Sequence, residues 1–256
     1  MQERKTGGMG YIVGSWPLDL DKSTIVFIHG AGGSGYFWQA QIDALADRAN
    51  TVAIDLPGHG RSDGSGKDNI ENYAKAVNAF IDEIHLSAPI PCGLSMGGAI
   101  AQQLLLDYPE RYPAGILIST GAKLKVASVI FETIEKDFAE FVDMVAKFAG
   151  SKKTNPKLLQ PFKEDIAQCK PEVVFGDFRA CDCFDSMARL SAIEVPVLIV
   201  TSEDDILTPP KYGEFLREKI KNAQRIHFLD AGHIVPVEKA EEVNAAINEF
   251  LEKQRI

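Results

Sequence analysis

The sequence contains no apolar run long enough to cross a membrane. A membrane-spanning helix needs about 20 consecutive apolar residues, whereas the longest apolar runs here have the length of a β-strand. The opening residues, Met1 to Gly8, also lack the apolar stretch of a secretory signal peptide. These absences predict a cytoplasmic protein that does not have a membrane as its partner.

Cysteine is scarce as well. The chain has four cysteines, at positions 92, 169, 181 and 183, which excludes a disulfide scaffold and favours free thiols in a reducing compartment. Cys181 and Cys183 are closer together than the usual spacing of about two to four residues between paired zinc ligands, and no histidine lies beside them. We therefore expect no metal site, and the sequence leaves the role of these two cysteines open.

Basic residues are fewer than acidic ones. With 27 Lys and Arg against 36 Asp and Glu, the formal net charge is −9, which disfavours a nucleic acid or an anionic membrane surface as a partner. The remaining composition, 45% hydrophobic and 25% charged over 256 residues, is typical of a globular protein and excludes collagen-like and disordered chains. We expect one large domain or a core with an insertion, present as a monomer or a homodimer.

Short runs rich in β-branched residues alternate with helical patterns along most of the chain. The expected strands are 23–29, 51–56, 89–94, 115–120, 195–201 and 225–230, and the expected helices between and after them are 38–47, 72–84, 97–108 and 237–254. The near-continuous apolar character of the strands is typical of a parallel sheet covered on both faces. The repeated strand–helix–strand order predicts a doubly wound, mostly parallel α/β sheet.

No strand pattern appears between residues 121 and 192. Apolar residues from Ile130 to Phe148 recur at helical spacing and predict one long amphipathic helix, whose Phe138, Phe141 and Phe148 we expect to pack against other helices. This block holds 11 basic and 11 acidic residues, so the whole net charge of −9 falls on the rest of the chain. We therefore expect a helical cap, residues 121–192, inserted into a core formed by residues 1–120 and 193–256.

Residues Gly93 to Gly97 match the pattern G-x-S-x-G between an expected strand and an expected helix. A sharp strand-to-helix turn of this kind exposes the hydroxyl of its central residue, here Ser95, and small flanking residues let the backbones pass closely. The amide of Met96 would then lie at a helix N-terminus, facing developing negative charge. Ser95 is therefore the candidate nucleophile.

A serine hydroxyl needs a base that is itself oriented by an acid. The histidines are at positions 29, 59, 85, 227 and 233. His85 at a helix end and His227 within a strand are expected to be structural, whereas His233 follows the last strand, at the sheet edge where sites form. The acid is expected after the preceding strand, where the residues alone do not choose among Glu203, Asp204 and Asp205.

The order and spacing of these motifs resemble the α/β-hydrolase fold family over nearly the whole chain apart from the insertion. His29 to Gly35 resembles the family's oxyanion loop, and Asp55 to Ser62 resembles the run after its next strand. Gly93 to Gly98 resembles its nucleophile elbow, and Ala231 to His233 with Glu238 resembles its histidine loop. With 22 residues before the strand at Ser23, the family's usual opening strands must be short.

The resemblance implies a role for five residues. The family's acid commonly lies four residues before a proline, which selects Asp205 ahead of Pro209. The catalytic residues are then Ser95, Asp205 and His233, and the amides of Ala31 and Met96 form the oxyanion hole. No cofactor and no metal are implied.

Two function classes compete with this interpretation. Gly30 to Gly35 also satisfies G-x-G-x-x-G, and Asp55 follows about 20 residues on, as in a dinucleotide-binding oxidoreductase. The oxidoreductase hypothesis assigns no role to Ser95, Asp205 and His233. A non-enzymatic receptor is the second alternative, because a fold does not settle a function.

Within the hydrolases, a serine nucleophile disfavours dehalogenases and epoxide hydrolases. C–C bond hydrolases resemble the layout but often carry Asn where this chain has Leu94, and the elbow looks more like those of esterases and enol-lactone hydrolases. We expect hydrolysis of carboxylic esters through an acyl-enzyme, on small-molecule substrates with small to medium neutral acyl groups. The neutral insertion, rich in phenylalanine, is expected to roof the pocket.

Overall fold

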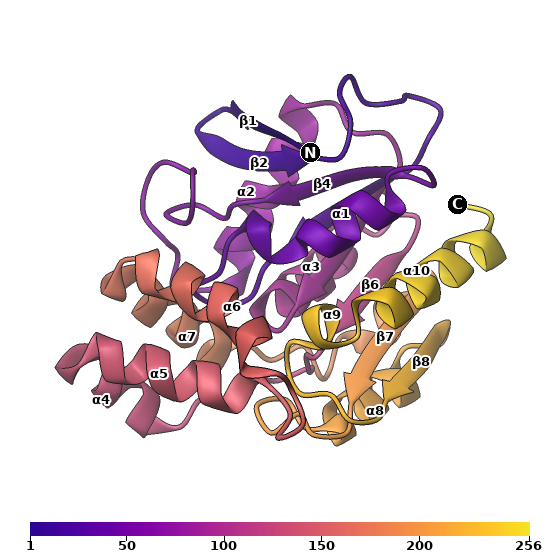
Figure 1. Cartoon of the computed structure of the whole chain (residues 1–256). Coiled ribbons are helices and arrows are strands. Elements are labelled where there is room, and N and C mark those ends of the chain that lie inside the picture. The colour runs from indigo at the N-terminus through magenta and orange to yellow at the C-terminus, as the bar shows by residue number, and fades with distance from the viewer.

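An eight-stranded β-sheet runs through the computed structural model, which describes residues 1–256 (Figure 1). The strands are β1 (Gln2–Thr6), β2 (Met9–Val13), β3 (Thr24–Ile28), β4 (Asn50–Ile54), β5 (Pro89–Leu94), β6 (Gly115–Ile118), β7 (Val197–Ser202) and β8 (Ala223–Phe228). Their spatial order is β1-β2-β4-β3-β5-β6-β7-β8, and every pair from β4 to β8 is parallel. The six expected strands are present as β3 to β8, and the expected parallel α/β sheet is confirmed.

The two opening strands are short, as expected. β1 and β2 have five residues each, pair antiparallel with one another, and β2 continues antiparallel onto β4. They therefore extend the sheet on the side away from β8.

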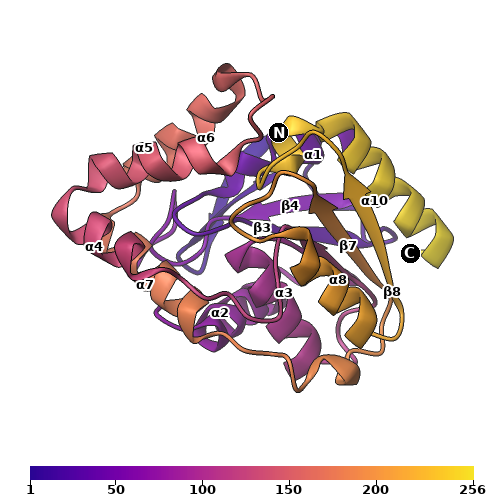
Figure 2. The same ribbon diagram turned by 90° about the horizontal axis from the view of Figure 1, so that it is seen from below.

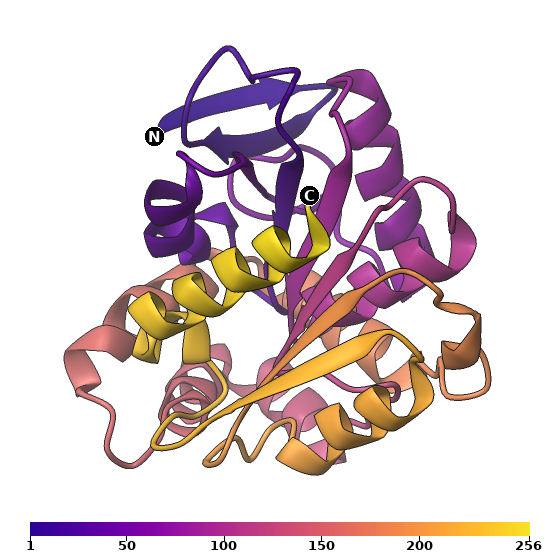
Figure 3. The ribbon, with the colours of Figure 1, turned by 90° about the vertical axis from the view of Figure 1, so that its right-hand side faces the viewer.

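Helices cover both faces of the sheet. α1 (Gln39–Leu45) and α10 (Ala240–Gln254) lie on one face, and α2 (Ile70–Glu83), α3 (Met96–Asp107) and α8 (Pro210–Lys219) lie on the other (Figures 1 and 3). Successive residues of β3 alternate between the two cores, with Phe27 packed beside Trp38 and Ile28 packed in the cluster of α2 and α3. This alternation explains why the strands read as continuous apolar runs.

Two of the expected helices have other bounds in the structure. α2 begins at Ile70, two residues before the expected start, because the Asn69 side chain accepts the Asn72 N–H at 2.8 Å. The expected closing helix 237–254 is wrong as a single element. It divides into α9 (Val235–Glu238) and α10, with Lys239 in a non-helical conformation between them.

Four α-helices and one short 3-10 helix (Leu190–Ala192) occupy the region between β6 and β7. The α-helices are α4 (Ser128–Lys136), α5 (Phe138–Ala149), α6 (Pro156–Gln168) and α7 (Pro171–Cys183), gathered at one end of the sheet (Figures 1 and 2). The only β pairing in this region is one isolated bridge between Lys123 and Asp185. The assignment of residues 121–192 as a separate cap stays a prediction.

The single long helix expected from Ile130 to Phe148 is wrong. The chain leaves the helical conformation at Asp137, whose carboxylate accepts the Glu140 N–H at 3.0 Å and so begins α5. A short acidic side chain competes with the helix backbone in this way at helix starts.

The aromatic stripe of the insertion is only partly buried. Phe138 stacks on Phe141, and Phe141 is completely buried with Ile134, Val142 and other apolar side chains of the insertion. Phe148 contradicts the expectation, because 41% of its surface is exposed. The buried face of α5 is formed by Phe141, Val142, Val145, Ala146 and Ala149, and Phe148 lies at the edge of this face. None of the helices combines the length and hydrophobicity needed to cross a bilayer.

Candidate active site

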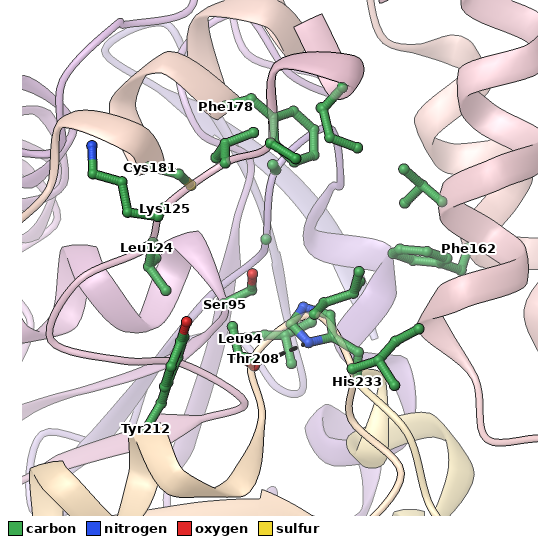
Figure 4. Close-up of a pocket in the computed structure, with 18 residues that line it drawn as sticks. Leu94, Ser95, Leu124, Lys125, Phe162, Phe178, Cys181, Thr208, Tyr212 and His233 are labelled. Atoms are coloured by element: carbon green, nitrogen blue, oxygen red, sulfur yellow. Dashed lines mark hydrogen bonds between the residues drawn. The ribbon is translucent and has the colours of Figure 1, made fainter. Parts of the chain in front are cut away.

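Ser95 stands on a strained turn between β5 and α3. Its backbone has φ 56° and ψ −116°, a conformation that side-chain-bearing residues rarely adopt. A Cβ at Gly93 would lie 2.0 Å from the Gly97 carbonyl oxygen, and a Cβ at Gly97 would lie 2.2 Å from that of Ile28. Glycine is therefore required on both sides of the turn, and Ser95 projects into a cavity above the sheet (Figure 4).

Two backbone amides beside Ser95 have no acceptor in the protein. Met96 is the first residue of α3, so its N–H has no partner within the helix. The N–H of Ala31, in the loop that follows β3, also donates to no protein atom. The helix N-terminus adds a field that favours negative charge at this point.

His233 reaches the same cavity from the loop after β8. Its Nδ1–H donates to the Asp205 carboxylate, with distances of 3.1 and 3.0 Å to the two oxygens, and lies 3.2 Å from Thr208 Oγ1 (Figure 4). Asp205 is also fixed by the N–H groups of Leu207 and Thr208, at 3.0 and 2.8 Å, and by the Thr208 hydroxyl at 2.7 Å. These contacts leave Nε2 of the imidazole as the ring atom that is free to act on Ser95.

The electrostatic setting keeps Asp205 ionised. Burial by itself raises the pKa of this carboxyl group, but the charge of His233 and the hydrogen bonds from His233 and Thr208 outweigh burial and lower the pKa below its usual value. Of the three neighbouring acids, only Asp205 contacts His233. Asp204 accepts the Ser151 hydroxyl instead, and Glu203 makes no side-chain hydrogen bond.

His29 fixes the direction of the Ala31 amide. Its Nδ1–H donates to the Gly30 carbonyl at 2.8 Å, while its Nε2 accepts the Leu56 N–H at 3.0 Å. Burial lowers the pKa of His29 to about 3, so the ring is neutral and holds one tautomer. Because C=O and N–H point in opposite directions in a trans peptide, anchoring the Gly30 carbonyl aims the Ala31 N–H the other way.

The loop that carries His233 is bound to the end of α5. The His233 N–H donates to the Ala149 carbonyl at 2.7 Å. The Glu238 carboxylate accepts the N–H groups of Gly232 and Ser151, both at 2.8 Å, and so ties the two loops together. A Cβ at Gly232 would lie 2.6 Å from the Gly150 carbonyl carbon, so the loops touch backbone to backbone.

A buried ion pair between His59 and Asp177 contacts the loop of residues 29–35. The His59 Nε2–H donates to Asp177 Oδ2 at 2.8 Å, and neither side chain is exposed. Burial lowers the pKa of His59, but the Asp177 charge and hydrogen bond outweigh it and hold the pKa well above 6.5. Asp177 was not identified from the sequence, because nothing local marks a single acid within an amphipathic helix.

The cavity above Ser95 has a volume of about 270 Å³ and is lined by 18 residues, 13 of them hydrophobic. Half of the lining lies between residues 121 and 192, including Phe162 and Phe178 (Figure 4). Lys125 is the one lysine or arginine at its wall, and its ammonium group is paired with Asp182 at 3.1 Å. Cys181 also lines the cavity, where burial raises the pKa of its thiol, and all four cysteines are free.

The remaining candidate residues fall outside the cavity. His227 lies in β8, where Nδ1 is 3.0 Å from Thr201 Oγ1, and His85 follows the end of α2. Asp55 is fully buried and accepts the N–H of Gly35 at 2.7 Å and of Arg61 at 2.9 Å. These bonds occupy the carboxylate that a dinucleotide ribose would require, which weakens the oxidoreductase hypothesis. No group of three or more His, Cys, Asp or Glu side chains has the geometry to hold a metal ion.

The sequence and the fold of this chain are similar to those of known proteins. The model of the alpha/beta hydrolase family matches residues 25–246. The chain is 26% identical to 3-oxoadipate enol-lactonase 2 of Acinetobacter baylyi, over 91% of this chain and 90% of that one. It is 30% identical to a thermophilic esterase of known structure, with a TM-score of 0.82 over 99% and 97% of the two chains. The enol-lactonase of Burkholderia xenovorans shares the fold, with a TM-score of 0.88 at 22% identity over 98% and 100% of the two chains.

The two adjacent buried histidines are expected to differ in charge at about pH 7.5. His59 is then protonated, and His29 is neutral. The pKa of His59 is raised above 6.5 in the folded state. Its contribution to the free energy of unfolding is therefore fully present below pH 6.5, and is lost as the pH rises through the folded-state pKa. Ring ¹⁵N NMR between about pH 6 and 9 measures both charge states. A His59 ring that titrates at 6.5 would contradict the ion pair.

Proposed function

The chain belongs to the alpha/beta hydrolase family, and we propose that it is a serine carboxylesterase acting through Ser95, His233 and Asp205. The observation that carries the proposal is the convergence of these groups at one cavity. The strained Ser95, the Asp205-bound imidazole and two unpaired amides come from four separate loops at the same edge of the sheet. This set is what acyl transfer to a serine requires.

The first half of the reaction forms an acyl-enzyme. Ser95 Oγ attacks the ester carbonyl carbon while His233 Nε2 takes the hydroxyl proton, and Asp205 stabilises the resulting imidazolium. The carbonyl oxygen becomes an oxyanion that accepts hydrogen bonds from the amides of Ala31 and Met96. The tetrahedral species then collapses, and His233 donates its proton to the departing alcohol.

The second half releases the acid. A water molecule attacks the acyl carbon, His233 Nε2 takes its proton, and the same two amides stabilise the second oxyanion. Collapse breaks the bond to Ser95 Oγ, which recovers its proton from His233. None of these steps uses a cofactor.

The lining of the cavity indicates the substrate class. Its walls are mainly apolar, and Lys125 is already paired with Asp182, so a charged acyl group would find no free counter-charge there. Residues 121–192 supply the roof and act as the cap of the site. We therefore assign small to medium neutral acyl esters as substrates.

Enol-lactone hydrolysis is the second candidate. A lactone is an internal ester, so the same groups would open the ring and keep the leaving oxygen within the product. The similarity to a 3-oxoadipate enol-lactonase favours this possibility. A panel of p-nitrophenyl acyl esters, dihydrocoumarin and a meta-cleavage product separates ester, lactone and C–C bond hydrolysis by their relative kcat/KM.

Replacing the nucleophile is expected to abolish ester hydrolysis while the fold is kept. For Ser95→Ala, kcat should fall by a factor on the order of 10⁶, because the three catalytic residues act as a unit. Circular dichroism and thermal unfolding check that the variant is folded. A folded Ser95→Ala protein that retains a tenth of the wild-type activity would overturn the mechanism.

The three neighbouring acids provide a matched set of variants. Asp205→Asn should lower kcat by roughly 10⁴, because an amide no longer selects the correct imidazole tautomer. Asp204→Asn and Glu203→Gln should matter far less, because neither side chain contacts His233. A larger loss for Asp204→Asn than for Asp205→Asn would show that the acid is wrongly assigned.

The size of the cavity predicts a limit on acyl length. Measured across acetyl, butyryl, octanoyl and palmitoyl esters, kcat/KM should be highest for the short and medium chains, because the cavity is confined by the insertion. A succinyl monoester of similar size is the control for charge and should be a poorer substrate than the butyryl ester. A maximum at palmitoyl would be incompatible with a confined pocket.

A further inference from the structure

Asp177 connects the insertion to the loop that holds Ala31. It lies on α7 and is fully buried, and its carboxylate accepts three hydrogen bonds. Oδ1 accepts the Tyr73 hydroxyl at 2.5 Å, and Oδ2 accepts both His59 Nε2–H and the Gly32 N–H at 2.8 Å. His59 forms a shielded ion pair with Asp177 and Tyr73 adds a neutral donor, whereas the third donor is the backbone of Gly32, the residue next to Ala31.

The Gly32 backbone is pressed against the insertion. Gly32 has φ +69°, and a Cβ there would lie 3.3 Å from Val174 Cγ2 and 3.4 Å from Ile166 Cγ2, on α7 and α6. Apolar side chains of α6 and α7 therefore flank the loop on the insertion side, and the Asp177 bond keeps the loop from moving away from them. The position of this backbone is fixed from the insertion side.

Two successive peptide groups of this loop are fixed from opposite sides. His29 anchors the Gly30 carbonyl, which belongs to the same peptide group as the Ala31 N–H. Asp177 anchors the Gly32 N–H, which belongs to the next peptide group. With the groups on both sides of its Cα fixed, Ala31 cannot rotate its N–H away from the cavity.

We propose that Asp177 is a positioning residue for the oxyanion hole, holding the Gly32 peptide so that the Ala31 amide points at the substrate's carbonyl oxygen. Asp177 touches no reacting atom and acts through the loop. The insertion thus contributes to transition-state stabilisation as well as to the roof of the pocket. This assignment rests on the proposed function, because it presumes that Ser95 generates an oxyanion.

Two substitutions at Asp177 test the assignment. Asp177→Asn removes the charge, and Asp177→Glu keeps the charge but moves the carboxylate by one methylene group. Displacing an oxyanion donor by about 1 Å should lower kcat for a butyryl ester by roughly 10- to 100-fold, with KM changed by less than about threefold. Glu172→Gln is the matched control, because it makes the same charge change at an exposed position of α7 and should leave kcat unchanged.

An oxyanion mimic provides a second readout that needs no turnover. Ser95 Oγ adds to the carbonyl carbon of an aryl trifluoromethyl ketone, its proton passes to His233, and the new oxyanion accepts bonds from the two amides. A ¹⁹F NMR titration should show that the dissociation constant of this adduct rises in the Asp177 variants by the same factor as kcat falls. A general structural role would not make the two losses equal.

Wild-type kcat and wild-type ketone affinity in folded Asp177 variants would overturn the proposal. A loss that appears only in KM, or failure of both variants to fold, would assign Asp177 a purely structural role and overturn it equally. A wild-type protein that binds the ketone but hydrolyses no ester would contradict the proposed function instead. In that case the ketone affinities of wild type and variants still decide the role of Asp177.

Discussion

Close backbone packing at the first turn of α3 is the constraint on which the site depends. Gly97 lies against the end of β3, Gly93 lies against Gly97, and a Cβ at Gly98 would come within 2.6 Å of the Thr120 side chain after β6. The turn is held in place by the Ser95 N–H, which donates to the Ile118 carbonyl at 3.0 Å, and by the Thr120 hydroxyl, which donates to the Ser95 carbonyl at 2.8 Å. These contacts keep Ser95 in a conformation that it would not adopt in a free chain.

Buried or partly buried carboxylates hold the loops around that turn. Each accepts backbone N–H groups, which compensates the charge and fixes the loop at the same time. The four that do so are Asp55 for the loop ending at Gly35, Asp177 for Gly32, Asp205 for the turn at Thr208, and Glu238 for Gly232 and Ser151. A hydrogen bond to a charged group contributes about 1.5–3 kcal/mol, so the loops are preorganised before any substrate arrives.

Residues 121–192 are hydrogen-bonded to two of the loops that form the proposed active site. Ala149 and Ser151 bind the loop that carries His233, and Asp177 binds the loop that carries Ala31. The roof of the cavity and the groups below it are therefore linked by direct hydrogen bonds. Substitutions in the insertion are expected to affect the orientation of catalytic groups as well as the shape of the pocket.

The sequence by itself determined the six parallel strands and the turn at Ser95, because periodicity and glycine spacing are local properties. It also placed Ser95, the candidate nucleophile, and His233, the candidate base, in the loops after β5 and β8. It misjudged the helix around Asp137, where capping by one side chain outweighed an apolar period.

The residues alone did not choose among Glu203, Asp204 and Asp205, because the contact that separates them depends on where a loop 28 residues further along places His233. Resemblance to a family pointed to the same acid without giving the physical reason. Only the tertiary structure brought Asp177 to Gly32, which is 145 residues away in the chain. Contacts of this range have no local sequence signal, since they arise when separately formed elements pack together.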